Sequence, residues 1–122
     1  MTPNEIIRAY RAVHELTGAV LPYKLARDIA RLKKRLSEEF EVVLACETSL
    51  AESYGGRSKN GQYDFPTRGA ADSFARDYKT FLEQEDRTID LPKVDLSKCA
   101  DMIRISPDAI DALDGIVFFE EV

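Results

Sequence analysis

The chain has 122 residues, 44% of them hydrophobic, and a formal net charge of −5 at neutral pH. This composition favours one domain, residues 1–122, that is large enough to bury a core, and it excludes a uniformly basic nucleic-acid-binding domain. No apolar run approaches the roughly 18 residues of a membrane span. The first residues lack the basic and apolar regions of a signal peptide, so we expect a cytoplasmic protein.

A first helix is expected over residues 1–18. Thr2 is a typical N-cap, Pro3 suits the first helical position, and Glu5 completes a capping box. Gly18 is expected to end this helix. The short link to Pro22 predicts that the next helix runs antiparallel to the first.

The most informative segment is a long helix expected over residues 22–54, which contains no glycine or internal proline. Its apolar residues recur at steps of three and four, which places them on one stripe of a helix. They are Leu25, Ile29, Leu32, Leu36, Phe40, Val43, Leu50 and Tyr54. At 1.5 Å per residue the helix would be about 50 Å long. We therefore expect a central, coiled-coil-like helix against which the other elements pack.

A small hairpin-like tip is expected over residues 57–66, because Asn60-Gly61 is a strong two-residue turn signal. A third helix follows over residues 67–85 and should pack back on the second half of the long helix. Its apolar face is formed by Ala71, Phe74, Tyr78, Phe81 and Leu82.

The acidic C-terminal segment, residues 87–122, alternates apolar and polar residues from Ile89 to Leu96, which indicates one or two short strands interrupted at Pro92. Another short strand is expected over residues 102–105. Ser106-Pro107 predicts the start of a short helix that Gly115 closes. The expected fold is therefore mainly α, with a minor β component: a long central helix, two antiparallel shorter helices, a tip, and a C-terminal segment of short strands plus a short helix.

Charge is distributed unevenly along the chain. Residues 1–37 carry eight Lys/Arg against three Asp/Glu, whereas residues 83–122 carry four against eleven. The acidic end can fold back on the basic half, or either end can face a partner. We predict two binding surfaces. The basic helix face comprises Lys24, Arg27, Arg31, Lys34 and Arg35, and the acidic region comprises Asp108, Asp111, Asp114, Glu120 and Glu121.

The basic helix face has two interpretations. At 100° per residue, Arg31 and Arg35 lie within about 20° of Lys24, away from the apolar stripe. Such a face can follow a nucleic-acid backbone or hold a phosphorylated ligand. Long cationic side chains can equally serve only to solubilise the free side of a two-helix layer.

No constellation of residues indicates catalysis, and we expect a non-enzymatic protein without cofactor or metal. His14 lacks other ligands at metal spacing and is expected to have a surface or packing role. Cys46 has apolar neighbours, which favours a buried, unreactive thiol, and Cys99 beside Lys98 is weak evidence for a nucleophile. Asp108, Asp111 and Asp114 recur every third residue and should share one face of the short helix, as a solvated surface.

Several segments together resemble a known family. They are Leu21-Pro22 before the basic run from Tyr23 to Arg27, the Asn60-Gly61 tip, the Ile89-Asp90-Leu91 segment, and Ile105-Ser106-Pro107. Their order is similar to that in a family of small phage and prophage proteins of Gram-positive bacteria, known as a domain of unknown function. The resemblance covers roughly residues 5–119, and its motifs are structural, so no functional residue is carried over. It implies a phage-encoded protein of the host cytoplasm.

Three functions remain open at this point. The first is binding of phage structural proteins as a virion-assembly accessory, and the second is anti-defence inhibition of a host effector complex, similar to small anti-CRISPR proteins. The third is binding of nucleic acid or a phosphorylated ligand through the basic helix face. A protein partner is favoured, and self-association is open because two short helices leave part of a long apolar stripe uncovered.

Overall fold

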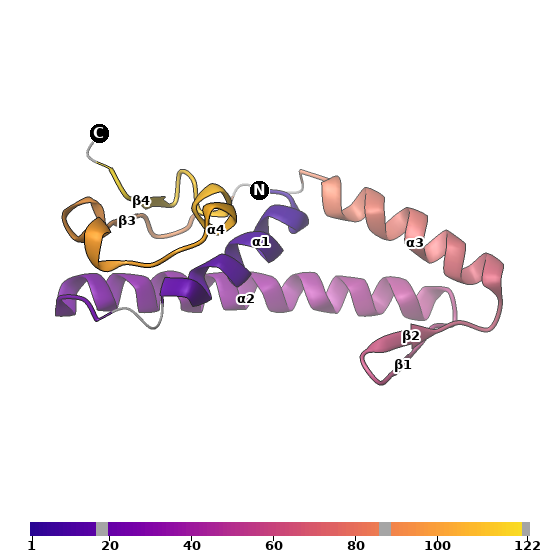
Figure 1. The fold of residues 1–122 in the computed structure, drawn as a ribbon. Coiled ribbons are helices and arrows are strands. Elements are labelled where there is room, and N and C mark those ends of the chain that lie inside the picture. Colours follow the sequence, from indigo (N-terminus) through magenta and orange to yellow (C-terminus); the bar gives the residue numbers. More distant parts are fainter. Residues whose placement is uncertain (17–19, 86–88, 121–122) are drawn as a thin grey trace.

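A computed structural model describes residues 1–16, 20–85 and 89–120. The chain is mainly helical, with small two-stranded sheets, as predicted. Its central element is α2, Tyr23–Ser53, which runs the length of the molecule while the other elements lie along it (Figure 1).

The N-terminal helix α1, Pro3–Val13, begins with the predicted cap. The Thr2 hydroxyl accepts a hydrogen bond from the Glu5 amide (3.1 Å), and the Glu5 carboxylate accepts one from the Thr2 amide (3.4 Å). One 3₁₀ turn, η1, His14–Leu16, follows, and Gly18 lies outside the described residues. Helix α1 packs on α2, where Tyr10 stacks on Phe40 with ring centroids 4.2 Å apart.

Helix α2 buries its apolar stripe unevenly. Ile29, Leu32, Leu36 and Val43 are buried, whereas Leu25, Phe40, Leu50 and Tyr54 are only half-buried. The predicted stripe is thus present, but it is fully covered mainly in the first half of the helix.

Beyond α2 the chain forms an antiparallel hairpin of β1, Arg57–Lys59, and β2, Gln62–Asp64. Asn60 and Gly61 form its turn with φ of 52° and 79°, the left-handed region that this dipeptide favours. Helix α3, Arg68–Glu83, then starts at Thr67, whose hydroxyl accepts from the Ala70 amide (3.0 Å). It contains no fully buried residue.

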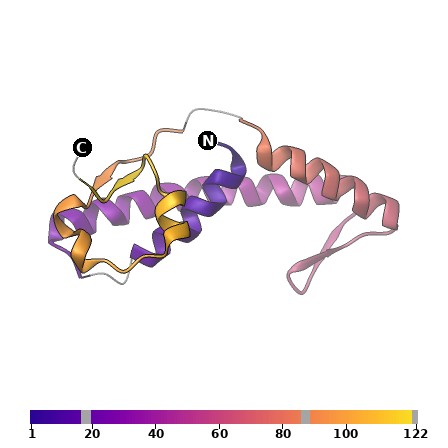
Figure 2. The same cartoon turned by 45° about the horizontal axis from the view of Figure 1, so that its top comes forward.

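The C-terminal segment returns to the first half of α2 (Figures 1 and 2). It comprises β3, Val94–Asp95; η2, Ser97–Met102; α4, Pro107–Ala112; and β4, Val117–Phe118. Strands β3 and β4 pair in parallel. The strand expected over residues 102–105 is wrong, because Met102 still belongs to a 3₁₀ helix whose last turn is closed by the Ile103 amide donating to the Ala100 carbonyl (3.2 Å).

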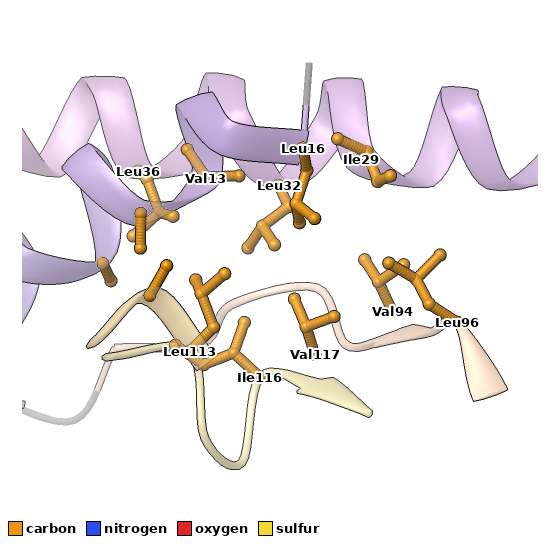
Figure 3. Packing of buried hydrophobic residues seen from close by; sticks show 13 residues of the cluster. Val13, Leu16, Ile29, Leu32, Leu36, Val94, Leu96, Leu113, Ile116 and Val117 are labelled. Atoms are coloured by element: carbon orange, nitrogen blue, oxygen red, sulfur yellow. The ribbon is translucent and has the colours of Figure 1, made fainter. Parts of the chain in front are cut away.

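The hydrophobic core lies between α1, α2 and this C-terminal segment (Figure 3). Side chains of the two helices face those of the C-terminal segment across one layer. The largest fully buried members are Val13, Leu16, Leu32, Leu36, Val94, Leu96 and Leu113. Each such aliphatic side chain stabilises the fold by roughly 1.5–3 kcal/mol relative to an exposed position. The core thus joins residues from the two ends of the sequence.

Candidate binding surface on the central helix

The basic helix face lies on the side of α2 that the core does not cover. Lys24, Arg27, Arg31 and Lys34 are all exposed. Within the described ranges Lys24, Arg31 and Lys34 make no salt bridge, and Arg27 makes only a 4.0 Å contact with Asp28. These four cations are therefore available to a partner.

Arg35 has a different environment from the other four cations. It is half-buried, its guanidinium bonds to Glu39 one turn later, and its Nη1 atom lies 3.8 Å from Glu38 Oε2. Glu39 is buried with 5% exposure, which the apolar periodicity did not predict. An arginine four residues before a glutamate was the available signal, because such a pair compensates the cost of burying a carboxylate. Arg35 therefore stabilises α2 and is less available to a partner than Lys24 or Arg31.

An apolar groove runs between the second half of α2 and α3. Its volume is about 760 Å³, and its floor on α2 is built mostly from small side chains. The lining residues are Val42, Ala45, Cys46, Ser49, Leu50 and Ser53 of α2, with Asp77, Thr80, Phe81 and Gln84 from α3 and its end. The walls of this groove contain one carboxylate and no lysine or arginine.

Cys46 corrects one expectation. Its thiol was expected to be buried among apolar neighbours, but it is exposed in this groove. The reason is that Cys46 lies about 40° around the helix from Val42, which is itself 46% exposed, so both face the side of α2 that is turned away from the core. Cys99, for which a nucleophilic role had little support, is buried within η2.

Helix α3 is held to the end of α2 by a tyrosine–carboxylate contact, and to the hairpin by a row of aromatic rings. The Tyr54 hydroxyl donates to Asp77 Oδ2. This hydrogen bond raises the pKa of Tyr54 and lowers that of Asp77, because it favours the neutral phenol and the ionised carboxylate. The ring row consists of Tyr63, Phe65, Phe74, Tyr78 and Phe81, with neighbouring centroids 5.1–6.3 Å apart.

Tyr78 connects this row to α2. Its pKa is raised, first by burial and then by the nearby carboxylate of Glu47. All five rings of the row are only half-buried. Contacts between half-buried rings hold α3 in place without enclosing it, which leaves one flank of α3 open as the groove.

The acidic region is dispersed rather than gathered on one helix face. Asp108 lies in the first turn of α4, but Asp114 lies beyond the end of α4 at Ala112, so the expectation of one shared helix face is wrong. Asp111 accepts a hydrogen bond from Arg8 Nη2 (3.2 Å). Glu120 is exposed and Glu121 lies outside the described residues.

The acidic end does fold back on the N-terminal half, but it contacts α1 rather than the basic helix face. The Arg8–Asp111 pair joins α1 to α4. The carboxylate of Glu15 accepts from both the amide and the hydroxyl of Ser106, at 2.9 Å each. The acidic end therefore pairs with the N-terminal half, as expected, but this pairing does not involve Lys24, Arg31 or Lys34.

The described ranges give little evidence for a metal site or for a membrane-spanning helix. No group of three or more His, Cys, Asp or Glu side chains is close enough there to hold a metal ion. His14 is exposed and packs edge-to-face on Tyr10, with ring centroids 4.7 Å apart. None of the helices described has the length and hydropathy needed to cross a membrane.

Comparison with known proteins gives no family for the chain. No family model, no curated protein and no solved structure matches it. The geometry of the α2 surface is therefore the basis for a functional proposal.

Proposed function

We propose that the chain is a non-enzymatic protein that binds another protein through the uncovered side of α2, as a phage-encoded accessory to virion assembly. The observation that carries the proposal is the open groove between α2 and α3. It leaves Val42 46% exposed at the edge of an apolar channel that the described residues do not fill. Exposed apolar channels of this kind typically receive a helix or an apolar segment of a partner. The phage origin rests on the family resemblance alone.

Nucleic-acid binding is the second candidate, and the unpaired cations of the basic helix face favour it. Lys24, Arg31 and Lys34 are exposed without salt bridges in the part of the chain described. Such cations attract phosphates in a strongly salt-dependent way. An apolar groove, however, contributes little to backbone binding, so the combination of groove and cations supports a protein partner better.

The anti-defence alternative has less support. It would use an acidic surface to imitate nucleic acid. Asp111 is engaged by Arg8, and the remaining carboxylates do not form one face. Anti-defence inhibition is one of the outcomes that the experiment below distinguishes.

A pull-down from phage-infected host cells tests the proposal, with bound proteins identified by mass spectrometry at low and moderate salt. We expect tagged wild-type protein to retain phage structural proteins, and Val42→Asp to lose them. Ile110→Asp is the matched control, because Ile110 is 44% exposed on α4, outside the groove.

The other outcomes separate the alternatives. Recovery of a host effector complex would contradict the assembly role and support anti-defence inhibition. Retention of nucleic acid alone, lost on raising the salt and in Arg27→Glu/Arg31→Glu, would contradict protein binding. Equal recovery by Val42→Asp and Ile110→Asp would show that the groove is not the contact.

A further inference from the structure

Helix α2 is electrically divided into two halves. Residues 23–35 carry six Lys/Arg and a single aspartate, whereas residues 36–53 carry five glutamates and no lysine or arginine. The sign changes near the midpoint of the helix, between Arg35 and Glu38. A helix with this pattern is complementary to itself when two copies run antiparallel.

The groove and the basic helix face also lie on one side of α2. At 100° per residue, Arg31, Val42 and Ser49 all fall within about 20° of Lys24 around the helix, and Cys46 lies within about 40°. The same line of α2 is therefore cationic in its first half and lined by small side chains in its second half. A two-fold axis needs one surface that pairs with itself in this way.

From this pattern, and resting on the proposed function for the choice of surface, we infer that a second copy of this chain occupies the groove when no other partner does. Two α2 helices pair antiparallel about an axis near Glu38. Full overlap of Tyr23–Ser53 then places Lys24 opposite the partner's Glu52 and Arg35 opposite the partner's Glu41.

The groove suits the cations that this pairing brings to it. In this register Arg31 lies opposite the partner's Ala45, so its aliphatic stem covers the small side chains of the floor. Asp77, which is bonded to Tyr54 and Arg76, lines the same groove and adds a negative charge beside it. Glu41 and Glu52 are exposed beside it on α2, and no groove residue repels a cation.

Charge complementarity favours a second copy over an unrelated helix. One chain carries both the basic half and the acidic half that the contact requires. Each copy inserts its basic half against the acidic half of the other, so the pairing is made twice. Its attraction is electrostatic over an exposed surface, and it should therefore weaken as salt is raised.

A charge-swap experiment tests the inference by analytical ultracentrifugation at low and moderate salt. The wild type should dimerise at low salt and dissociate on raising it. Lys24→Glu/Arg31→Glu should be monomeric, because position 24 then places a carboxylate against the partner's Glu52. Glu41→Lys/Glu52→Lys should also be monomeric, because positions 41 and 52 then place cations against the partner's Arg35 and Lys24.

Mixing the two variants provides the decisive measurement. In the mixed pair positions 24 and 52 carry opposite charges in both half-contacts, so the mixture should form a heterodimer although each variant alone is monomeric. Lys33→Glu/Lys98→Glu is the matched control and should dimerise like the wild type, because Lys33 lies about 180° from Lys24 around α2. The mixture also controls for folding, since a misfolded variant would not recover association.

Cross-linking tests the antiparallel register. Arg31→Cys would place a thiol about one residue along the axis from the partner's Cys46, so oxidation should give covalent dimers. Adding Cys46→Ser should abolish them. In the wild type the two Cys46 thiols would lie about 24 Å apart along the axis at 1.5 Å per residue, too far to cross-link.

Three results would overturn the inference: a wild type that is monomeric at low salt, a dimer that both charge reversals leave intact, or wild-type dimers linked through Cys46. A monomer that still recovers phage structural proteins would leave the proposed function standing. A salt-sensitive dimer that recovers no other protein would support the inference and contradict the proposed function.

Discussion

The two ends of α2 have very different surroundings. The end formed by residues 23–36 is enclosed by α1, β3, α4 and β4, and it contains the whole buried cluster contributed by α2. The end formed by residues 41–53 is accompanied by a hairpin and by α3, which buries no residue fully. We call these the closed end and the open end. One continuous helix thus acts as a core element over one half and as a support for an exposed groove over the other.

The two ends differ physically in the number of layers of secondary structure that cover α2. At the closed end α1 and the C-terminal segment together cover α2, so Leu32 and Leu36 lose all contact with water. At the open end α3 and the hairpin strands lie beside α2, and none of their residues is fully buried. Local opening should therefore require less free energy at the open end than at the closed end.

The largest effect is expected from truncating a core leucine of the closed end. Leu32→Ala should lower the free energy of unfolding by about 2–5 kcal/mol, because it leaves a cavity in a packed layer. Urea unfolding followed by circular dichroism measures this. Leu44→Ala is the control on the same helix and should change the free energy by only about 0.5 kcal/mol, since Leu44 is 41% exposed. Equal losses at both positions would refute the contrast between the ends.

A smaller effect is expected at Gly56, where the open end is most tightly packed. A Cβ atom there would lie 2.6 Å from Phe65 Cε1 and 2.9 Å from the Ala51 carbonyl oxygen. Gly56→Ala should therefore displace the Phe65 ring and cost about 1–3 kcal/mol, a typical range for overpacking. Hydrogen exchange should accelerate in α3 and the hairpin.

Gly69→Ala is the control for this change. Its added methyl group has open space, with the nearest atom 3.9 Å away, and alanine favours the helix by about 1 kcal/mol. It should slow exchange in α3. Faster exchange in the amides of α1 or α4 in Gly56→Ala would contradict the independence of the two ends.

The smallest effect is expected from removing the Tyr54 hydroxyl. Tyr54→Phe should leave global unfolding nearly unchanged while the pKa of Asp77 rises toward its ordinary value near 3.8, because the hydroxyl no longer stabilises the carboxylate. An NMR titration of the Asp77 carboxyl carbon measures this shift. Asp95, whose pKa is lowered by the Ser97 amide, should titrate as in the wild type.

The pH dependence of this contact follows from the direction of both shifts. Asp77 has a lowered pKa, so its contribution is present above the unfolded value and is lost as the pH falls through the folded value. Tyr54 has a raised pKa, so its contribution is present below about pH 10 and is lost as the pH rises through the folded value. Exchange of α3 amides should therefore gain an additional acceleration at both extremes in the wild type, but not in Tyr54→Phe.

Local signals in the sequence predicted the helices well. Thr2 with Glu5, Thr67 before α3, and Ser106-Pro107 each begin a helix as expected, because a cap needs only residues that are neighbours in the chain. The Asn60-Gly61 turn is local in the same sense.

Long-range features could not be predicted in the same way. The parallel pairing of Val94 with Val117 joins two runs of two residues, too short for any periodicity to show. The exposure of Cys46 depends on which flank of α2 remains uncovered, and that is decided by the position of α3 rather than by neighbouring residues. The cationic positions were identified correctly as exposed, except that Arg35 is partly committed to the buried Glu39.

The parallel pairing of β3 with β4 also sets the order in which the chain can fold during synthesis. The open end is contiguous in sequence, since α2, the hairpin and α3 follow one another, so its contacts can form as soon as they leave the ribosome. The closed end needs Val117 and Phe118, which are made after all the other described elements. Contacts of such wide sequence separation form slowly. The nascent chain therefore acquires its least stable half first, and it exposes Leu32 and Leu36 until β4 is released.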